Sequence, residues 1–253
     1  MMKQLKKLLV GVLCAPVLAF ASGEAVHLDR APSEKFRDAL AIQRGAQVFV
    51  NYCLNCHSAS YMRYNRLKDV GLTEDQIKDN LLFTADKVGE TMKVAMTRDD
   101  AKAWFGAAPP DLTVVARSRA SGDGSGADWL YTYLRTFYRD ENRPTGWNNV
   151  AFSNVGMPHV LYELQGEQTA RHVKVSDGHG GEKEIIELEL SKPGKLSKAE
   201  YDSLVGDLVA YLVYMGEPGA EKRRQTGLIV ILGLSVLLVL SYLLKREFWK
   251  DVH

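Results

Sequence analysis

Two cysteines and a histidine lie within five residues of one another, at Cys53, Cys56 and His57. The pattern Cys-x-x-Cys-His is typical of covalent haem attachment. In such a site the two thiols bond the two vinyl groups of one haem, and the adjacent histidine lies beneath the iron as its proximal ligand. We therefore predict one haem c, bound covalently through Cys53 and Cys56, with His57 as an iron ligand.

Closely spaced cysteines also occur in three other kinds of site. A zinc site needs further ligands, usually a second Cys-x-x-Cys pair or paired histidines, and the sequence offers no such partner. A thioredoxin-like redox pair needs a βαβ setting, which the flanking residues do not indicate. A structural disulfide is disfavoured by so short a spacing. Haem attachment is the best interpretation of these residues.

The segment 154–158, Asn-Val-Gly-Met-Pro, offers a second ligand for the iron. A haem that passes electrons without rearranging needs a sixth ligand on its distal side. Gly156 permits unusual backbone angles and Pro158 stiffens the chain that follows, so Met157 is expected on a constrained loop. His159 is the rival ligand, and an empty sixth position is the remaining alternative.

Residues 1–21 have the features of a secretory signal peptide. Three lysines precede an apolar run over residues 8–20, which ends in Ala19-Phe20-Ala21 before Ser22. Bulky Leu13 argues against a lipid-modified Cys14, so Cys14 is expected to leave with this segment. The haem domain is therefore expected to mature outside the cytoplasm, where thiols have few reducing competitors.

A single apolar stretch, residues 226–244, lies near the other end of the chain. It holds nineteen uncharged residues, which span roughly 28 Å as a helix and match a bilayer core. Basic residues flank it on both sides, so the positive-inside rule does not orient it. The signal peptide orients the helix instead: because the amino-terminal part is exported, the helix is expected to cross inward and to leave residues 245–253 in the cytoplasm.

Charge differs between the compartments. The whole chain has a formal net charge of +1, but residues 22–221 hold 23 Lys and Arg against 29 Asp and Glu, a net charge of −6. An acidic exported domain attracts basic soluble partners and raises their encounter rate. About 200 residues suffice for one domain with its own core.

Helices are predicted on both sides of the haem motif. Phe36, Leu40, Val48 and Phe49 recur at near-helical spacing before it, and Gly45 with Ala46 offers a flat place for another helix to cross. A capping box at Ser197 and Glu200 begins a helix with an apolar stripe that ends at Gly216. This helix is expected to cross the one before the motif.

The middle of the chain is predicted to alternate between helices and loops. Thr73 caps a helix that starts at Glu74, Met92 and Met96 lie four apart on another helix, and residues 128–138 form a third. Pro109 and Pro110 impose a stiff extended loop between them. Residues 171–175 and 184–190 predict a β-hairpin with a glycine-rich turn. The predicted fold class is mainly α.

These motifs together resemble the cytochrome c1 family, which supplies the haem subunit of the cytochrome bc1 complex. The resemblance covers nearly the whole chain and rests on the cysteine motif, the segment 108–112 followed by Arg117, the loop 156–158 and the anchor after a basic run. It implies a class I cytochrome c-like domain with His57 and Met157 as axial ligands. It also implies that Pro110 lies against the haem and that Arg117 pairs with a propionate, which suits the bidentate guanidinium. The hairpin near Gly178 departs from the family pattern.

The resemblance also implies a function. The chain would pass electrons from a Rieske iron–sulfur protein to a soluble or anchored c-type cytochrome, beside cytochrome b in a quinol–cytochrome c reductase. We expect it in the inner membrane of a bacterium, with the haem domain in the periplasm and no nucleic-acid partner. Two alternatives remain open: an anchored electron shuttle without partner subunits, and a haem-based sensor with an open sixth position.

Overall fold

The described part of the chain is rich in helix, with two small sheets and one long helix at the carboxy terminus, which confirms the predicted fold class. The computed structural model describes residues 27–176 and 181–251. The predicted signal peptide, with Cys14, lies outside the described residues. The helices are η1 (Ser33–Arg37), α2 (Ala39–Val48), the π-helical turn η2 (Phe49–Cys53), η3 (Tyr64–Val70), α3 (Glu74–Asn80), α4 (Arg98–Phe105), α5 (Val115–Ser118), α6 (Gly126–Arg135), α7 (Tyr162–Gln165), α8 (Lys198–Gly216) and α9 (Ala220–Phe248).

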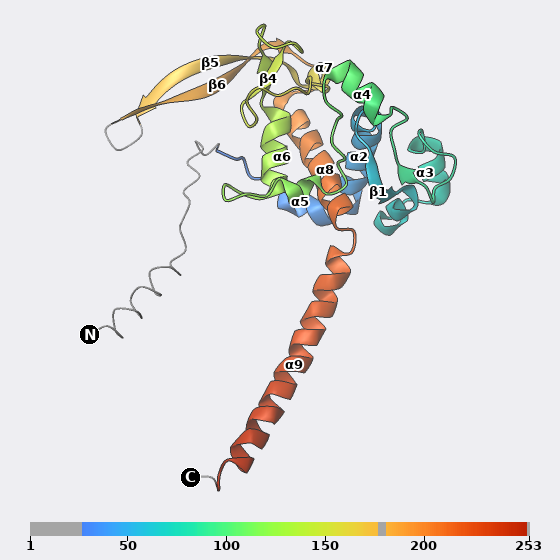
Figure 1. Cartoon of the computed structure of the whole chain (residues 1–253), viewed down its shortest axis with the longest axis vertical. Helices are drawn as coiled ribbons and strands as arrows, with labels where there is room; N and C mark the ends of the chain where they lie inside the picture. Colours follow the sequence, from blue (N-terminus) through green and yellow to red (C-terminus); the bar gives the residue numbers. More distant parts are fainter. Residues whose placement is uncertain (1–26, 177–180, 252–253) are drawn as a thin grey trace, which may run out of the picture.

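The centre of the domain is the crossing of α2 and α8, as the small residues on α2 predicted (Figure 1). A Cβ atom added to Gly45 would lie 2.0 Å from the carbonyl oxygen of Asp207 and 2.8 Å from Cβ of Tyr211. Only glycine allows this approach. Phe49 packs on Tyr211, with ring centroids 5.3 Å apart. Leu40 was expected on the packed face but is 60% exposed, because α8 covers the opposite side of α2.

Helix α8 begins and ends where the sequence predicted. Ser197 and Glu200 form the capping box at its start, and Gly216 is its last residue. The helix is buried over most of its length, including Val205, Leu208 and Tyr211. Helices α2, α5 and α6 all pack against α8.

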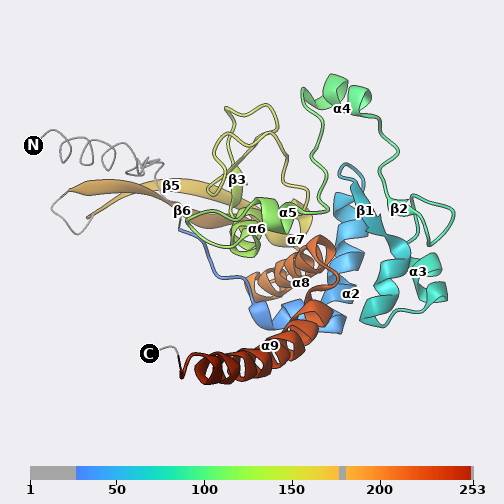
Figure 2. The same ribbon diagram turned by 60° about the horizontal axis from the view of Figure 1, so that its bottom comes forward.

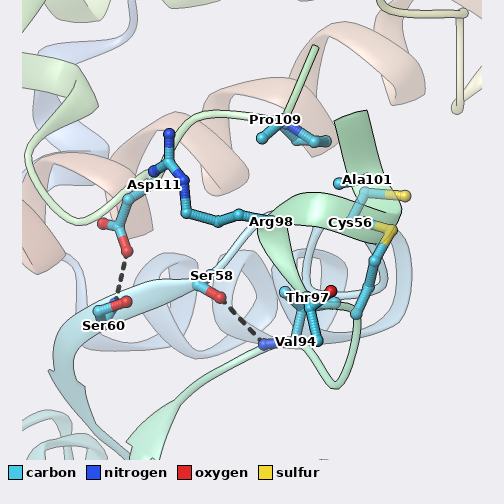
Figure 3. Close-up of a pocket in the computed structure, with 11 residues that line it drawn as sticks. Cys56, Ser58, Ser60, Val94, Thr97, Arg98, Ala101, Pro109 and Asp111 are labelled. Atoms are coloured by element: carbon cyan, nitrogen blue, oxygen red, sulfur yellow. Dashed lines mark hydrogen bonds between the residues drawn. The ribbon is translucent and has the colours of Figure 1, made fainter. Parts of the chain in front are cut away.

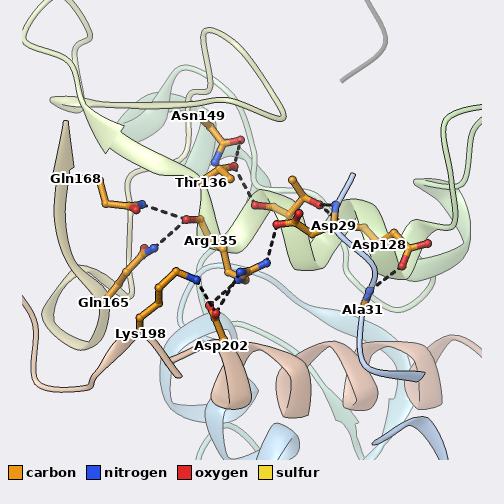
Figure 4. Close-up of polar contacts among 11 residues, drawn as sticks. Asp29, Ala31, Asp128, Arg135, Thr136, Asn149, Gln165, Gln168, Lys198 and Asp202 are labelled. Carbon is orange, nitrogen blue, oxygen red and sulfur yellow. Dashed lines mark hydrogen bonds and ion pairs between the residues drawn. The ribbon is translucent and has the colours of Figure 1, made fainter. Parts of the chain in front are cut away.

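Helix α6 is fastened on both sides by charged and polar groups (Figure 4). Arg135 at its end bonds Asp202 of α8 at 2.6 Å and Asp29 of the amino-terminal segment at 2.8 Å. The backbone nitrogen of Ala31 donates to Asp128 at 2.8 Å. The segment before α2 is thus held to both the start and the end of α6, and the end of α6 is also held to α8.

The predicted helix over residues 128–138 is three residues too long. Helix α6 ends at Arg135, and Phe137 and Tyr138 belong to strand β3 (Phe137–Arg139). Strand β3 pairs with β4 (Trp147–Asn149) in antiparallel register, and Arg139 pairs with Thr169 of β5 (Gly166–Ser176). Backbone pairing across the sheet therefore outweighs the local helical pattern.

The predicted β-hairpin is confirmed as β5 and β6 (Glu182–Pro193), whose pairing begins at Gly166 and Pro193. The strand order of the sheet is β4-β3-β5-β6. Figure 1 shows the two long strands reaching away from the helices as a ribbon. The glycine-rich turn that the sequence predicts includes residues 177–180, which lie outside the described part of the chain.

A second sheet pairs β1 (Ala59–Arg63) with β2 (Thr91–Met92) next to the haem motif. The prediction that Met92 and Met96 lie on one helix is wrong. Met92 pairs with Ala59 and is fully buried, and the next helix, α4, starts only at Arg98 after its cap Thr97. Helix α3 does start at Glu74 behind a Thr73 cap, as predicted. Figure 2 shows α4 standing apart from the α2–α8 pair.

The carboxy-terminal helix α9 is long and apolar enough to cross a membrane. It has 29 residues, a mean hydropathy of 2.7 in its most apolar window, and no part of that window is buried against the rest of the chain. The predicted span 226–244 lies inside it. Figure 1 shows α9 extending away from the domain, and its apolar side chains, such as Leu228 and Leu238, are more than half exposed.

Candidate haem site

The two cysteines lie where α2 gives way to a wider helical turn. In η2 the backbone nitrogen of Leu54 donates to the carbonyl oxygen of Phe49, five residues back, at 2.9 Å. The carbonyl oxygen of Cys53 then accepts from the nitrogens of Cys56 at 3.1 Å and His57 at 2.8 Å. Short π-helical turns are frequent at functional sites. The turn brings Cys53, Cys56 and His57 together after the end of α2.

Both thiols are free, and neither is fully buried within the chain. Burial and the neighbouring Cys56 raise the pKa of the Cys53 thiol to about 12. The two cysteines do not form a disulfide. Within residues 27–176 and 181–251, no three or more His, Cys, Asp and Glu side chains gather as a metal site would require. Both thiols are therefore available to bond a haem.

His57 is oriented by the proline loop. Its Nδ1 atom lies 2.8 Å from the carbonyl oxygen of Pro110. Since a carbonyl only accepts, Nδ1 carries the proton and Nε2 has its lone pair free. Burial lowers the pKa of His57, while the bond to Pro110 and the charge of Asp111 act in the opposite direction. A neutral imidazole with one nitrogen fixed by a carbonyl is the usual arrangement of a metal-binding histidine.

The loop that carries Pro110 is tied to strand β1 (Figure 3). The Asp111 carboxylate accepts hydrogen bonds from the backbone nitrogens of Ser60 and Thr113, each at 2.8 Å. The backbone nitrogen of Leu112 donates to the carbonyl oxygen of Ser58 at 2.9 Å. The loop therefore has a fixed position relative to the residues that follow His57.

A small polar cavity of about 130 Å³ lies beside Cys56 (Figure 3). Its lining includes Ser58, Thr97, Arg98 and Asp111. Neither His57 nor Met157 lines it. The cavity is therefore not the space between the two predicted axial ligands.

Met157 lies on a loop that is fastened at Asn154. Asn154 has a positive φ of 61°, whereas Gly156, where the sequence predicted an unusual angle, does not. The Asn154 side chain and carbonyl oxygen each accept a hydrogen bond from Arg143 at 3.0 Å, and its backbone nitrogen donates to Asn148 at 2.9 Å. The loop is thus rigid for reasons that its own sequence does not reveal.

The hydroxyl of Tyr133, on α6, donates a hydrogen bond to the sulfur of Met157 at 3.4 Å. Tyr133 is 8% exposed, and burial raises the pKa of its hydroxyl, so the hydroxyl keeps its proton. Tyr133 lies within the helix predicted over residues 128–138. Its contact with a residue 24 positions away could not be read from helical periodicity.

His159, the rival ligand, lies in the aromatic core. Its ring stacks on Phe137 with centroids 4.8 Å apart and meets the edge of Trp147 at 5.0 Å. It is 3% exposed, and burial lowers its pKa to about 4. The two rings enclose the imidazole, which gives His159 a packing role.

Two arginines follow the proline loop and point to different places. Arg117, the predicted propionate partner, bonds Glu217 after α8 at 3.1 Å. The guanidinium of Arg119 lies over the ring of Trp129, 4.4 Å from its centroid, and Trp129 stacks on Tyr133 at 4.8 Å. Arg119, which the sequence did not single out, is therefore connected to the Met157 loop through aromatic contacts.

The donor set fits a covalently attached haem. It comprises two free thiols, an imidazole whose Nε2 is available, and a thioether on a rigid loop. Thioether-forming cysteines with histidine and methionine ligands are the donors of cytochromes c.

Comparison with known proteins agrees with the interpretation of the site as a haem site. The Cytochrome C1 family matches residues 30–185 and 194–252, and the unmatched stretch falls in β6 of the hairpin. Cytochrome c1 of Allochromatium vinosum is 49% identical over 243 residues, 96% of each chain. A protein of Nitrosomonas europaea named ammonia monooxygenase gamma subunit is 48% identical over 252 residues, 100% of each chain. Cytochrome c1 of Rhodospirillum rubrum is 27% identical over 85% of this chain and 83% of that one. The chain belongs to the cytochrome c1 family, the haem subunit of the bc1 complex.

Proposed function

We propose that the chain holds one haem c through thioether bonds to Cys53 and Cys56, with His57 and Met157 as the two axial ligands of its iron. The observation that carries this proposal is the 2.8 Å contact between Nδ1 of His57 and the carbonyl oxygen of Pro110. It fixes the imidazole in the tautomer that binds iron through Nε2. In this proposal Pro110 also borders the haem.

The chain's residues hold and insulate the redox group and perform no bond-making chemistry. When bound, haem supplies a one-electron couple. Two ligands from separate rigid loops keep the same coordination in both oxidation states, and histidine with methionine ligation favours a high reduction potential. The fastening at Asp111 and at Asn154 therefore serves rapid transfer, since neither loop has to move.

We propose a Rieske iron–sulfur protein as the electron donor and a c-type cytochrome as the acceptor, with cytochrome b in the same assembly. The acidic balance of residues 22–221 supports a basic acceptor, because opposite charge raises encounter rates. In this proposal residues 1–21 direct export to the periplasm, α9 anchors the chain in the inner membrane, and residues 245–253 remain in the cytoplasm.

The name of the Nitrosomonas relative points to a second set of partners, the other subunits of an ammonia monooxygenase. It deserves a test because that relative matches this chain over its full length at 48% identity. Purification of the tagged chain in mild detergent decides between the two assemblies. Co-purification with a haem b subunit and an iron–sulfur protein, seen in the reduced optical spectrum and by peptide identification, supports the bc1 assignment. Co-purification with monooxygenase subunits instead would replace it.

The propionate partner is a separate part of the proposal. Arg117 is the residue implied by the family resemblance, yet its guanidinium already has Glu217 as a partner. Arg119 has aromatic neighbours that connect it to Met157. Both are therefore candidates, and substitution of each distinguishes them.

A further inference from the structure

Tyr133 has one side-chain hydrogen bond within the described part of the chain, and its acceptor is the sulfur of Met157. The hydroxyl oxygen lies 3.4 Å from the sulfur. A thioether sulfur is a weak acceptor with two lone pairs. One lone pair can therefore accept the O–H while the other is directed at a metal.

The tyrosine ring is held so that its hydroxyl cannot turn away. Trp129 stacks on one face, with centroids 4.8 Å apart and planes inclined by 12°, and Phe137 meets it edge-on at 5.0 Å. The backbone carbonyl of Tyr133 accepts a hydrogen bond of 2.7 Å from the buried side chain of Asn149. The donor is thus preorganised, as a group that tunes a nearby metal ligand must be.

We propose that Tyr133 is a positioning residue that raises the reduction potential of the haem through the sulfur of Met157. An O–H donor withdraws electron density from the thioether and weakens it as a ligand of ferric iron more than of ferrous iron. Hydrogen bonds to a ligand are one of the means by which a protein sets a haem potential. The bond also keeps the sulfur facing one direction. This inference rests on the proposed ligation by Met157.

The chain contains a matched contact that lacks the proposed role. The hydroxyl of Tyr211 donates to the sulfur of Met92 at 3.1 Å. Both residues of that pair are buried, at 0% exposure each. The two contacts share the same chemistry, and only one of them involves a proposed iron ligand.

The test is redox titration of the full chain in detergent-solubilised membranes, with its partner subunits retained. Tyr133→Phe removes the hydroxyl and keeps the ring. We expect the haem to stay attached and the absorption band of thioether-ligated ferric haem to persist. The ratio of oxidised to reduced protein at a fixed applied potential should rise about threefold, which corresponds to a reduction potential lower by about 30 mV for a one-electron couple. Tyr211→Phe is the control and should leave the potential unchanged.

Four results test the inference and the ligation on which it rests. Tyr133→Phe with thioether ligation retained and an unchanged potential overturns the inference. Equal shifts in Tyr133→Phe and Tyr211→Phe also overturn it, because the effect is then not transmitted through Met157. In a Met157→Leu background, Tyr133→Phe should produce no additional shift, and a shift as large as in the native background contradicts the role of the sulfur. An unchanged potential in Met157→Leu alone overturns the proposed ligation itself, which separates the two failures.

Discussion

The imidazole of His57 is bound to the carbonyl oxygen of Pro110, 53 residues further along the chain, at 2.8 Å. A carbonyl cannot be removed by substitution, so the orientation of the imidazole depends on what holds the proline loop. That is the Asp111 carboxylate, which accepts from the backbone nitrogens of Ser60 and Thr113. Asp111 thus connects the proximal side of the site to β1, together with the hydrogen bonds from Leu112 to Ser58 and from Tyr61 to the Thr113 hydroxyl.

The first prediction concerns Asp111. Asp111→Asn should lower the melting temperature at neutral pH, because the charged acceptor of two backbone donors is lost, at a cost of about 1–3 kcal/mol. Burial acts to raise the pKa of Asp111, but the hydrogen bonds from Thr113 and Ser60 outweigh it and the net pKa is lowered. Asp111 therefore stabilises the fold above its unfolded pKa of about 4, and that contribution disappears as the pH falls through the folded value.

The measurement is the melting temperature of native and Asp111→Asn protein as a function of pH. The difference in melting temperature between the two proteins should become smaller as the pH falls below about 4. Asp79→Asn, at an exposed position of α3, is the control and should match native protein throughout. A gap that is the same at neutral and acidic pH contradicts the role given to the carboxylate.

The second prediction concerns Met157. Met157→Leu should leave haem covalently attached and lower the reduction potential strongly, because the thioether ligand that favours ferrous iron is lost. Redox titration measures the shift, and carbon monoxide should then bind the reduced protein readily. Met92→Leu, a substitution at a buried methionine with another partner, should alter neither property. An unchanged potential in Met157→Leu removes Met157 from the coordination sphere.

The third prediction separates Arg117 from Arg119. Loss of a cation beside haem propionates favours the oxidised, more positive state and lowers the potential. We expect Arg119→Gln to lower it more than Arg117→Gln, because Arg117 bonds Glu217 and Arg119 lies over Trp129. Redox titration of both variants decides, and a larger shift in Arg117→Gln would restore Arg117 as the propionate partner.

The fourth prediction concerns the helix crossing. Gly45→Ala places a methyl group 2.0 Å from the carbonyl oxygen of Asp207, so α2 and α8 must separate. We expect the free energy of unfolding to fall by about 3 kcal/mol, which lowers the melting temperature by roughly 6–12 °C for a chain of this size. Gly122→Ala has nothing within 4 Å of the added atom and serves as the control. Equal melting temperatures of the two variants would mean that the crossing can relax.

Local sequence signals located the ends of several elements correctly. The caps at Thr73 and Ser197 and the glycine at 216 are decided by groups within a few residues, so they could be read directly. Gly45 predicted the helix crossing because close packing needs a residue without a side chain. The apolar run predicted the candidate membrane span.

The errors arose where distant residues decide the local structure. Met92 is in a strand because Ala59 pairs with it, and α6 stops at Arg135 because Phe137 and Tyr138 pair with β4. The rigid Met157 loop is held by Arg143 and Asn148, which the sequence does not connect with it. For the site, the motif residues could be predicted one by one, while the contacts of His57 with Pro110 and of Met157 with Tyr133 required the fold.

The most direct measurement is mass spectrometry of the mature chain purified from membranes under denaturing conditions. We expect the added mass of one haem, retained after denaturation and mapped to the peptide that contains Cys53 and Cys56. A mature chain with both thiols unmodified would contradict it.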